Sequence, residues 1–387
     1  YKILNGTSYA NIADTDGNLE VSINGNNWTF DGNGVLTLPG TQLSQIITTS
    51  SNVQINSSTK PIDPPTTWVA TYGDVDNLTT VYAEGVAYDS NGYIYVCGSN
   101  GGSGQTPYLS KLDNTGNIVW QKTYDVPVYS VVQCVAIDND GNILSSLVLD
   151  DYRTVLIKSN YTNGNIIWQT EIQHYDYIKI LGIDVDSNND IYAVGTAAGL
   201  TFNDGLILQK YDTTDGTLVW QKNADSYTKG YGIKIDSNDD ICVSGWYNNP
   251  DTSSDNCLIQ KYDNTGTLLW QRLFGDEGDF LYDDGYGIAL DSLNNIYVIG
   301  TTEAQGPSGT NGIVFKYDTD GTLQWQKVFG NTNLHNTYSY AISIDSSDNI
   351  YVNGNGYDST GIDCLFTAKL DTSGNVLWQR ILYATNG

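Results

Sequence analysis

One dipeptide, Trp-Gln, recurs six times along the chain, and its spacings are 48, 52, 50, 55 and 53 residues. Two further series keep the same register through all six copies: a lysine nine or ten residues before each tryptophan, and an aspartate earlier in each copy. The tryptophans are Trp120, Trp168, Trp220, Trp270, Trp325 and Trp378; the lysines are Lys111, Lys158, Lys210, Lys261, Lys316 and Lys369; the aspartates are Asp89, Asp138, Asp186, Asp236, Asp291 and Asp345. The chain therefore contains six copies of a unit of about 50 residues.

Each copy is expected to form four short β-strands. In residues 285–330, GIALD and NIYVIG flank an Asp/Asn turn, and GIVFKYD and TLQWQKVFG flank a second turn that ends in Gly321. The strand segments are rich in β-branched and aromatic residues, and Gly, Asn and Asp separate them. A four-stranded sheet of this size needs neighbours to cover its faces. The period therefore predicts an all-β fold, a β-propeller of four-stranded blades.

Six blades are the first expectation, because six copies each carry their own outer strand. Their inner strands are predicted at 85–89, 134–138, 182–186, 232–236, 287–291 and 341–345. A surplus outer-strand motif, WVATYG at 68–73, has no inner strands before it. It leaves seven blades as the alternative, in which this motif completes a further blade.

The repeat pattern resembles a known family. The run G-[IV]-x-[IVL]-D-S-x-x-[ND]-I-Y-V-x-G, followed by K-[YL]-D-x-x-G-x-[LV]-x-W-Q, is similar to the bacterial β-propeller repeat, a type first described in seven-bladed propellers. The resemblance covers residues 68–387. It implies the fold and no particular reaction, because one fold hosts many functions.

Residues before the repeats differ in composition and are predicted to form separate parts. We expect a small β-rich N-terminal segment at 1–60, a proline-rich linker at 61–67 and the propeller at 68–387. The run WTFDGNGVLTLPG resembles a short element of structural and tail-fibre proteins of marine tailed bacteriophages. That resemblance implies a segment that attaches to neighbouring virion proteins, and a generic β-hairpin is the alternative.

Charge and composition exclude several classes of partner. The chain carries 44 acidic and 17 basic residues, a net charge of −27, so nucleic acid and anionic membrane surfaces are unsuitable partners. The sequence holds no apolar run long enough for a membrane-spanning helix, so we expect no membrane insertion. The five cysteines are odd in number, and four of them fall at matched positions in different blades, so we expect buried free thiols.

The repeated residues have structural interpretations. The tryptophans are expected to pack between blades, and each lysine is expected to pair with the aspartate of its unit. The Asp/Asn turns could bind calcium, but Asp, Asn and Gly are also what tight turns require. The turn interpretation is favoured, and neither a metal nor a cofactor is predicted.

The binding surface is predicted on one face of the ring. In a propeller the Asp/Asn turns lie on one face, and the variable middle loops and blade crossings lie on the other. The variable face is rich in aromatic residues with nearby Asn and Asp, which suits sugars or proteins as ligands. The candidate ligand-binding residues are Tyr227, Tyr231, Trp246, Tyr247, Tyr282, Tyr286, Tyr338 and Tyr340.

No catalytic residues are predicted. The chain lacks the HExxH, GxSxG, P-loop and dinucleotide-binding motifs, and His174 and His335 are its two histidines. Acidic pairs such as Asp283 and Asp284 could serve a glycosidase, but neighbouring strand residues point apart. The sequence therefore favours a non-enzymatic structural or fibre protein at a virion surface, which attaches to a host-surface glycan or protein. The alternatives are a secreted or cell-surface carbohydrate-binding propeller and a polysaccharide-cleaving enzyme, and homo-oligomerisation stays open.

Overall fold

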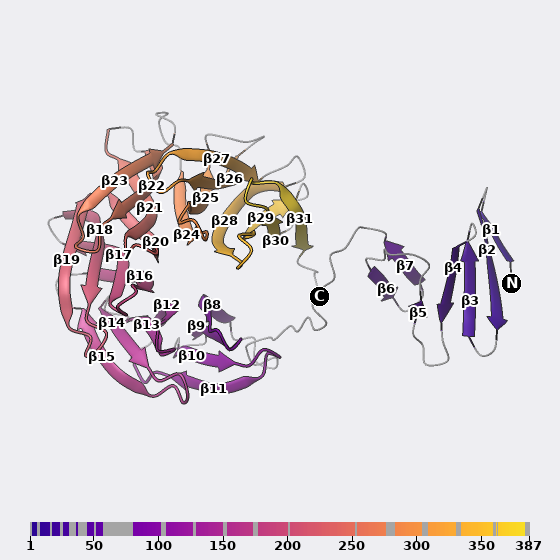
Figure 1. Ribbon diagram of the computed structural model, residues 1–387, viewed down its shortest axis with the longest axis horizontal. Coiled ribbons are helices and arrows are strands. Elements are labelled where there is room, and N and C mark those ends of the chain that lie inside the picture. Colours follow the sequence, from indigo (N-terminus) through magenta and orange to yellow (C-terminus); the bar gives the residue numbers. More distant parts are fainter. Residues whose placement is uncertain are drawn as a thin grey trace. The chain divides into compact units, whose positions relative to one another are not determined.

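The computed structural model of the chain divides into two compact units, residues 1–69 and 70–387 (Figure 1). In the first unit it describes the backbone of seven strands. From residue 80 it describes the chain except for 102–105, 127–128, 150–152, 173–176, 200–201, 252–253, 276–282, 304–308, 330–333, 359–360, 362 and 384–387. Side chains are described from residue 82, except at those positions and at 101, 198–199, 202–204, 225–226, 334–336, 358 and 382–383. The sequence boundary expected at 61–67 lies outside the described residues.

The N-terminal unit contains two antiparallel sheets. The first has the order β1-β2-β3-β4-β5, and the second is the hairpin β6-β7. The strands are β1 (Lys2–Asn5), β2 (Ser8–Thr15), β3 (Asn18–Ile23), β4 (Asn26–Phe30), β5 (Leu36–Thr37), β6 (Gln45–Thr49) and β7 (Asn52–Asn56). The run that resembles the phage element spans β4 and β5.

The second unit is a six-bladed β-propeller, as predicted, and each blade is a four-stranded antiparallel sheet. Blades 1 to 3 consist of β8 (Thr80–Tyr88), β9 (Ile94–Gly101), β10 (Thr106–Leu112), β11 (Ile118–Thr123); β12 (Val131–Ile137), β13 (Ile143–Val148), β14 (Thr154–Ser159), β15 (Ile166–Ile172); and β16 (Tyr177–Val185), β17 (Ile191–Gly199), β18 (Phe202–Tyr211), β19 (Leu218–Ser226).

Blades 4 to 6 follow the same order. They consist of β20 (Thr228–Ile235), β21 (Ile241–Asn249), β22 (Ser254–Tyr262), β23 (Leu268–Phe274); β24 (Asp284–Leu290), β25 (Ile296–Thr302), β26 (Asn311–Tyr317), β27 (Leu323–Phe329); and β28 (Leu334–Ile344), β29 (Ile350–Asp358), β30 (Asp363–Leu370), β31 (Val376–Tyr383). In every blade the first strand lies innermost and the fourth outermost (Figure 1). None of the described residues forms a helix that could cross a membrane.

The repeated aspartates build the turns between the first two strands. In blade 5 one carboxylate oxygen of Asp291 accepts the backbone N–H groups of Leu293 and Asn295, and the other accepts the hydroxyl of Tyr297. Side-chain hydrogen bonds of this kind hold a tight turn without any metal. The described residues contain no group of three or more His, Cys, Asp or Glu side chains placed to share a metal ion.

The lysine series pairs with the aspartates in blades 2 to 6. The Nζ–Oδ2 distance is 2.8 Å for Lys158 and Asp138 in blade 2, and 3.3 Å for Lys369 and Asp345 in blade 6. In blade 1, Lys111 instead donates to the carbonyl oxygen of Tyr161 in the next blade at 3.0 Å. The repeated lysines therefore connect strands within blades 2 to 6, and Lys111 connects blade 1 to blade 2.

Trp120, Trp168, Trp220, Trp270 and Trp325 pack against the next blade, as the sequence predicts, whereas Trp378 of blade 6 contacts Tyr351 of its own blade. The indole nitrogen of Trp325 donates to the carbonyl oxygen of Thr372 in the following blade at 3.2 Å, and its ring lies against Gly374 of the same turn. All six tryptophans are half-buried rather than enclosed. Five clusters of buried hydrophobic residues join consecutive blades from blade 1 to blade 6. All five cysteines are buried and free.

The facing surfaces of blades 6 and 1 are more exposed than the other blade surfaces. Val86 of blade 1 is 69 % exposed, whereas Ile233 and Ile288 at the same repeat position are 4 % and 6 % exposed. Leu365 of blade 6 is 61 % exposed, and its counterpart Cys257 is 1 % exposed. None of the buried clusters among the described residues joins these two blades, and Figure 1 shows their strands standing apart.

Candidate functional site

Every inner strand contains one β-bulge at the same repeat position. The strand pairing skips one residue, five residues before the repeated aspartate, in all six blades. A bulged residue has no cross-strand partner, and the local kink redirects its side chain. The bulged residues are Glu84, Gln133, Leu181, Tyr231, Tyr286 and Tyr340. We call this set the bulge ring, because the six inner strands surround the centre of the propeller.

A glycine in the second strand makes room for the bulge. A Cβ atom on Gly300 would overlap the carbonyl oxygen of Asp284, two residues before the bulged Tyr286. Gly98, Gly195, Gly245 and Gly354 stand in the same relation to their own inner strands. Close approach of one backbone to another is a position that requires glycine. Blade 2 has Leu147 there, so it forms its bulge without this contact.

Aromatic side chains from blades 4, 5 and 6 contact one another in one continuous group, in which the ring pairs between blades are tilted. The ring centroids of Tyr231 and Tyr286 are 5.4 Å apart, and those of Tyr286 and Tyr340 are also 5.4 Å apart. Tyr338 stacks on Tyr340 at 6.4 Å, with an interplanar angle of 7°. At the other end the indole nitrogen of Trp246 donates to the hydroxyl of Tyr231 at 2.8 Å. We call these five residues the aromatic arc, and its geometry matches the favoured arrangements of aromatic pairs.

Charged side chains adjoin the aromatic arc. The hydroxyl of Tyr286 donates to Asp284 Oδ2 at 2.8 Å, and Lys229 Nζ lies 5.0 Å from the centre of the Trp246 ring. The pKa of Asp284 is raised to about 6, mainly by burial and also by the nearby carboxylates of Asp255 and Asp283. The Tyr286 hydrogen bond and Lys229 act in the opposite direction. Burial also raises the pKa of Tyr231 to about 12, so its hydroxyl is neutral at physiological pH.

The other half of the bulge ring is chemically different. Glu84, Gln133 and Leu181 occupy the positions that tyrosines occupy in blades 4 to 6. The amide of Gln133 donates to Glu84 Oε2 at 3.1 Å. The bulge ring therefore has aromatic side chains in blades 4 to 6 and acidic, amide and aliphatic side chains in blades 1 to 3. A ligand at this ring would find aromatic surface for apolar contact and polar groups whose hydrogen bonds fix its orientation.

Five of the eight sequence-predicted residues lie together in the aromatic arc. Tyr247 does not join it, because its side chain packs against the hydrophobic cluster between blades 3 and 4. Tyr227 also stands outside the stack: it has a φ of 69°, and its carbonyl oxygen accepts the N–H of Asn248. Tyr282 lies outside the described residues.

The sequence analysis did not predict that Asp255 and Lys229 lie at the site, and it did not predict the bulge ring. A signal for the bulge was nevertheless present. Tyr231 and Tyr286 are each flanked by glycines, and the second strand of five of the six repeats carries a glycine at the same position, preceded by Y-V-x in three of them. Isolated glycines inside strands often mark bulges or close backbone contacts.

Comparisons with known proteins support a β-propeller repeat family for this chain. A family model described as a beta-propeller repeat matches residues 270–305, and one described as outer membrane protein assembly factor BamB matches residues 60–230. No curated protein matches. A crystal structure of a protein of unknown function from Bacteroides caccae aligns with a TM-score of 0.47 and 12 % identity, covering 76 % of this chain and 94 % of that chain.

These matches concern the propeller, which is a fold suited to binding and to protein–protein interaction. They do not bear on the phage resemblance of the N-terminal segment, which stays a prediction. The repeat model and the six observed blades agree that the second unit of this chain is similar to β-propeller repeat proteins.

Proposed function

We propose that the propeller is a non-enzymatic attachment module, which binds a host-surface glycan or protein through the aromatic arc. The observation that carries this proposal is the continuous series of side-chain contacts across three blades that joins Trp246, Tyr231, Tyr286, Tyr340 and Tyr338. Repeated packing between blades does not account for it, because blades 1 to 3 have Glu84, Gln133 and Leu181 at the bulge. The arc is thus a local feature added to a regular scaffold.

The physical properties of the arc suit binding. Its rings are held by one another and by the Trp246 and Tyr286 hydrogen bonds, so little side-chain freedom remains to be lost when a ligand binds. Tyr340 is 48 % exposed and offers its face to a partner. Tyrosine and tryptophan supply large contact areas and polar groups at the same position, which is why they dominate binding energies.

The negative charge of the protein limits which classes of partner can bind. Asp255, Asp283 and Asp284 adjoin the arc, and the chain as a whole carries −27. A surface of this sign repels sialylated and sulfated polymers and favours neutral glycans or basic protein patches. In the same proposal residues 1–60 attach the propeller to neighbouring virion proteins, and the protein is displayed outside the cell.

The proposal is tested by binding of the full-length chain to an array of neutral and sialylated glycans and to a lysine-rich peptide. We expect Tyr286→Ala and Tyr340→Ala each to weaken the observed binding at least tenfold, because each removes one ring of the stack. Tyr129→Asn is the matched control: Tyr129 is 64 % exposed and lies outside the arc, and Asn tolerates its φ of 70°.

Two results would contradict the proposal. Binding that survives both arc substitutions but is lost on changes within residues 1–60 would place the binding site in the N-terminal unit. Release of reducing ends from a polysaccharide ligand would show an enzyme, and Asp284 would then be the first acid to substitute.

A further inference from the structure

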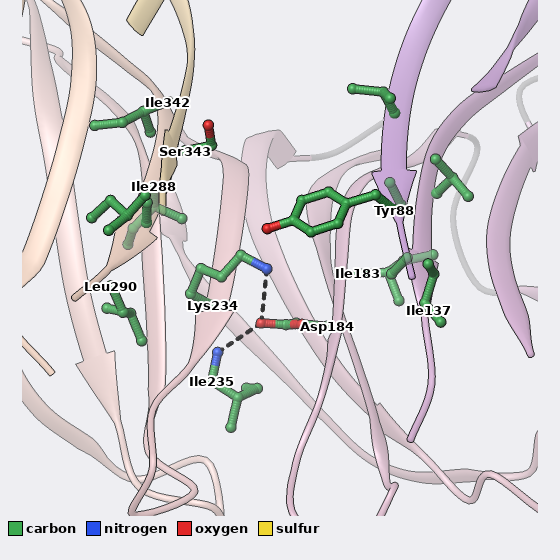
Figure 2. Close-up of a pocket in the computed structure, with 16 residues that line it drawn as sticks. Tyr88, Ile137, Ile183, Asp184, Lys234, Ile235, Ile288, Leu290, Ile342 and Ser343 are labelled. Atoms are coloured by element: carbon green, nitrogen blue, oxygen red, sulfur yellow. Dashed lines mark hydrogen bonds and ion pairs between the residues drawn. The ribbon is translucent and has the colours of Figure 1, made fainter. Parts of the chain in front are cut away.

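The six inner strands line a cavity of about 460 Å³ at the centre of the propeller, and this cavity is open to solvent. It is lined by residues from the three positions that precede the repeated aspartates, on the turn side of the bulge ring. Its volume lies within the usual range for small-molecule sites, about 300–1,000 Å³. Most of the lining residues are aliphatic, with Ile137, Ile183, Ile288 and Leu290 among them (Figure 2), and polar and apolar atoms share the lining surface about equally.

One ion pair lies among the aliphatic residues that line the cavity. Two positions before the repeated aspartate, the blades carry Ala87, Ala136, Asp184, Lys234, Ala289 and Ser343. Asp184 of blade 3 and Lys234 of blade 4 face each other there, with Nζ 3.2 Å from Asp184 Oδ2. The same carboxylate oxygen accepts the backbone N–H of Ile235 at 2.9 Å. Figure 2 shows the Tyr88 hydroxyl directed toward this pair from the opposite wall.

Blade packing does not require this pair. The other four blades have alanine or serine at the position and pack in the same ring. The Lys234 side chain is 44 % exposed and that of Asp184 is 19 % exposed, so solvent reaches both groups. Ion pairs with this exposure contribute little to stability. A hydrogen-bond acceptor and a donor therefore lie side by side, accessible to solvent, among aliphatic lining residues.

We propose that this cavity binds a small neutral ring compound with adjacent hydroxyl groups, of the size and chemistry of a monosaccharide. One hydroxyl donates to the Asp184 carboxylate, and its neighbour accepts from the Lys234 ammonium. The C–H faces of the ring contact the isoleucine and alanine walls. Asp184 and Lys234 together carry no net charge, so the pair selects neither anions nor cations, whereas a vicinal diol satisfies both groups at once.

The test is calorimetry and saturation-transfer NMR of the full-length chain with D-glucose, D-galactose, D-mannose and L-fucose. We expect at least one of them to bind. Lys234→Met and Asp184→Asn should each weaken that binding at least tenfold. Asn keeps an acceptor for the Ile235 N–H, so the wall stays in place. Lys327→Met makes the same chemical change on the outermost strand β27 and should leave binding unchanged.

A cavity-filling variant separates loss of the site from loss of the fold. Ser343 is exposed to the cavity, so Ser343→Leu occupies the chamber without entering the core. It should abolish sugar binding while the thermal midpoint stays at the parent value. The proposal is wrong if none of the four sugars binds, if binding is equal in Lys234→Met and the parent, or if sodium acetate binds more tightly than the sugars. The aromatic arc is a separate site, and Tyr286→Ala should not change sugar binding in the cavity.

Discussion

The indole ring of Trp270 lies directly on the backbone of Gly321, a turn residue of the next blade. A Cβ atom at Gly321 would stand 2.9–3.0 Å from three ring atoms, and the glycine has a φ of 76°. Gly321→Ala should therefore lower the free energy of unfolding by about 2–4 kcal/mol, from backbone strain and from displacement of the indole.

The control for this prediction is Gly141→Ala. Gly141 has a φ of 84°, but its Cβ would meet nothing closer than 4.0 Å. It should cost only about 1 kcal/mol, the strain term alone. Equal denaturant midpoints for the two variants would show that the indole moves aside without cost.

Lys158→Met should destabilise the propeller by about 3–5 kcal/mol, because it leaves the Asp138 carboxylate buried without its counter-ion. The two side chains are 7 % and 0 % exposed, and Lys158 also donates to Thr213 of the next blade. The exposed pair Arg153–Glu171 is the comparison, and Arg153→Met should cost no more than about 1 kcal/mol. Urea titration measures the free energy of unfolding of both variants. Similar midpoints for Lys158→Met and Arg153→Met would contradict the prediction.

Gly300→Ala should disrupt the bulge of blade 5, since the methyl group would overlap the carbonyl oxygen of Asp284. We expect a loss of about 3 kcal/mol or more, together with displacement of Tyr286 from the aromatic arc. Tyrosine ring resonances in NMR spectra report the second effect. Unchanged Tyr286 chemical shifts would contradict the role assigned to the glycine.

The stability of the protein should depend on pH through Asp284, whose folded-state pKa of about 6 lies above its ordinary value of 3.8. Below about pH 4 the group is protonated in both states. Between pH 4 and 6 it is protonated in the folded state alone, so its contribution to stability falls as pH rises, by at most about 3 kcal/mol in total. Asp284→Asn should thus raise the thermal midpoint at pH 8 and leave it unchanged near pH 4.

The substitution Asp263→Asn is the comparison, because the contribution of Asp263 to stability is expected to change with pH in the opposite direction. Hydrogen bonds from the side chain of Thr265 and the backbone of Thr267 lower the pKa of Asp263, so its carboxylate stabilises the fold above its ordinary pKa, and this contribution is lost as pH falls. The substitution should lower the midpoint at pH 8, and the difference should shrink toward pH 3. The assignment for Asp284 fails if its variant shows this same trend.

The sequence predicted the blades because the features that define them are local and repeated. Asp291 and Gly321 sit in short turns, and Trp325 recurs at a fixed offset, so periodicity alone reveals them. The arc was predicted as a surface rather than as a stack, because the meeting of Tyr231 and Tyr286 depends on a bulge that breaks strand alternation. Tyr247 lies outside the arc, because its side chain packs against the hydrophobic cluster between blades 3 and 4.

The cavity pair escaped prediction entirely. Asp184 and Lys234 are 50 residues apart, and each is an ordinary polar residue in its own strand. Their meeting follows from the curvature that brings equivalent positions of adjacent blades together, which a repeat alignment can reveal only after the ring is known.

The bulge ring has a consequence for how such proteins can diversify. A bulged residue forms no cross-strand pair, so its identity is free of the pairing rules that govern the rest of the strand. The six copies already hold a carboxylate, an amide, an aliphatic chain and three phenols at this one position, on nearly the same backbone. Single substitutions at the bulge position can therefore change the side chains around the central opening in one blade after another, while the backbone of the propeller is kept.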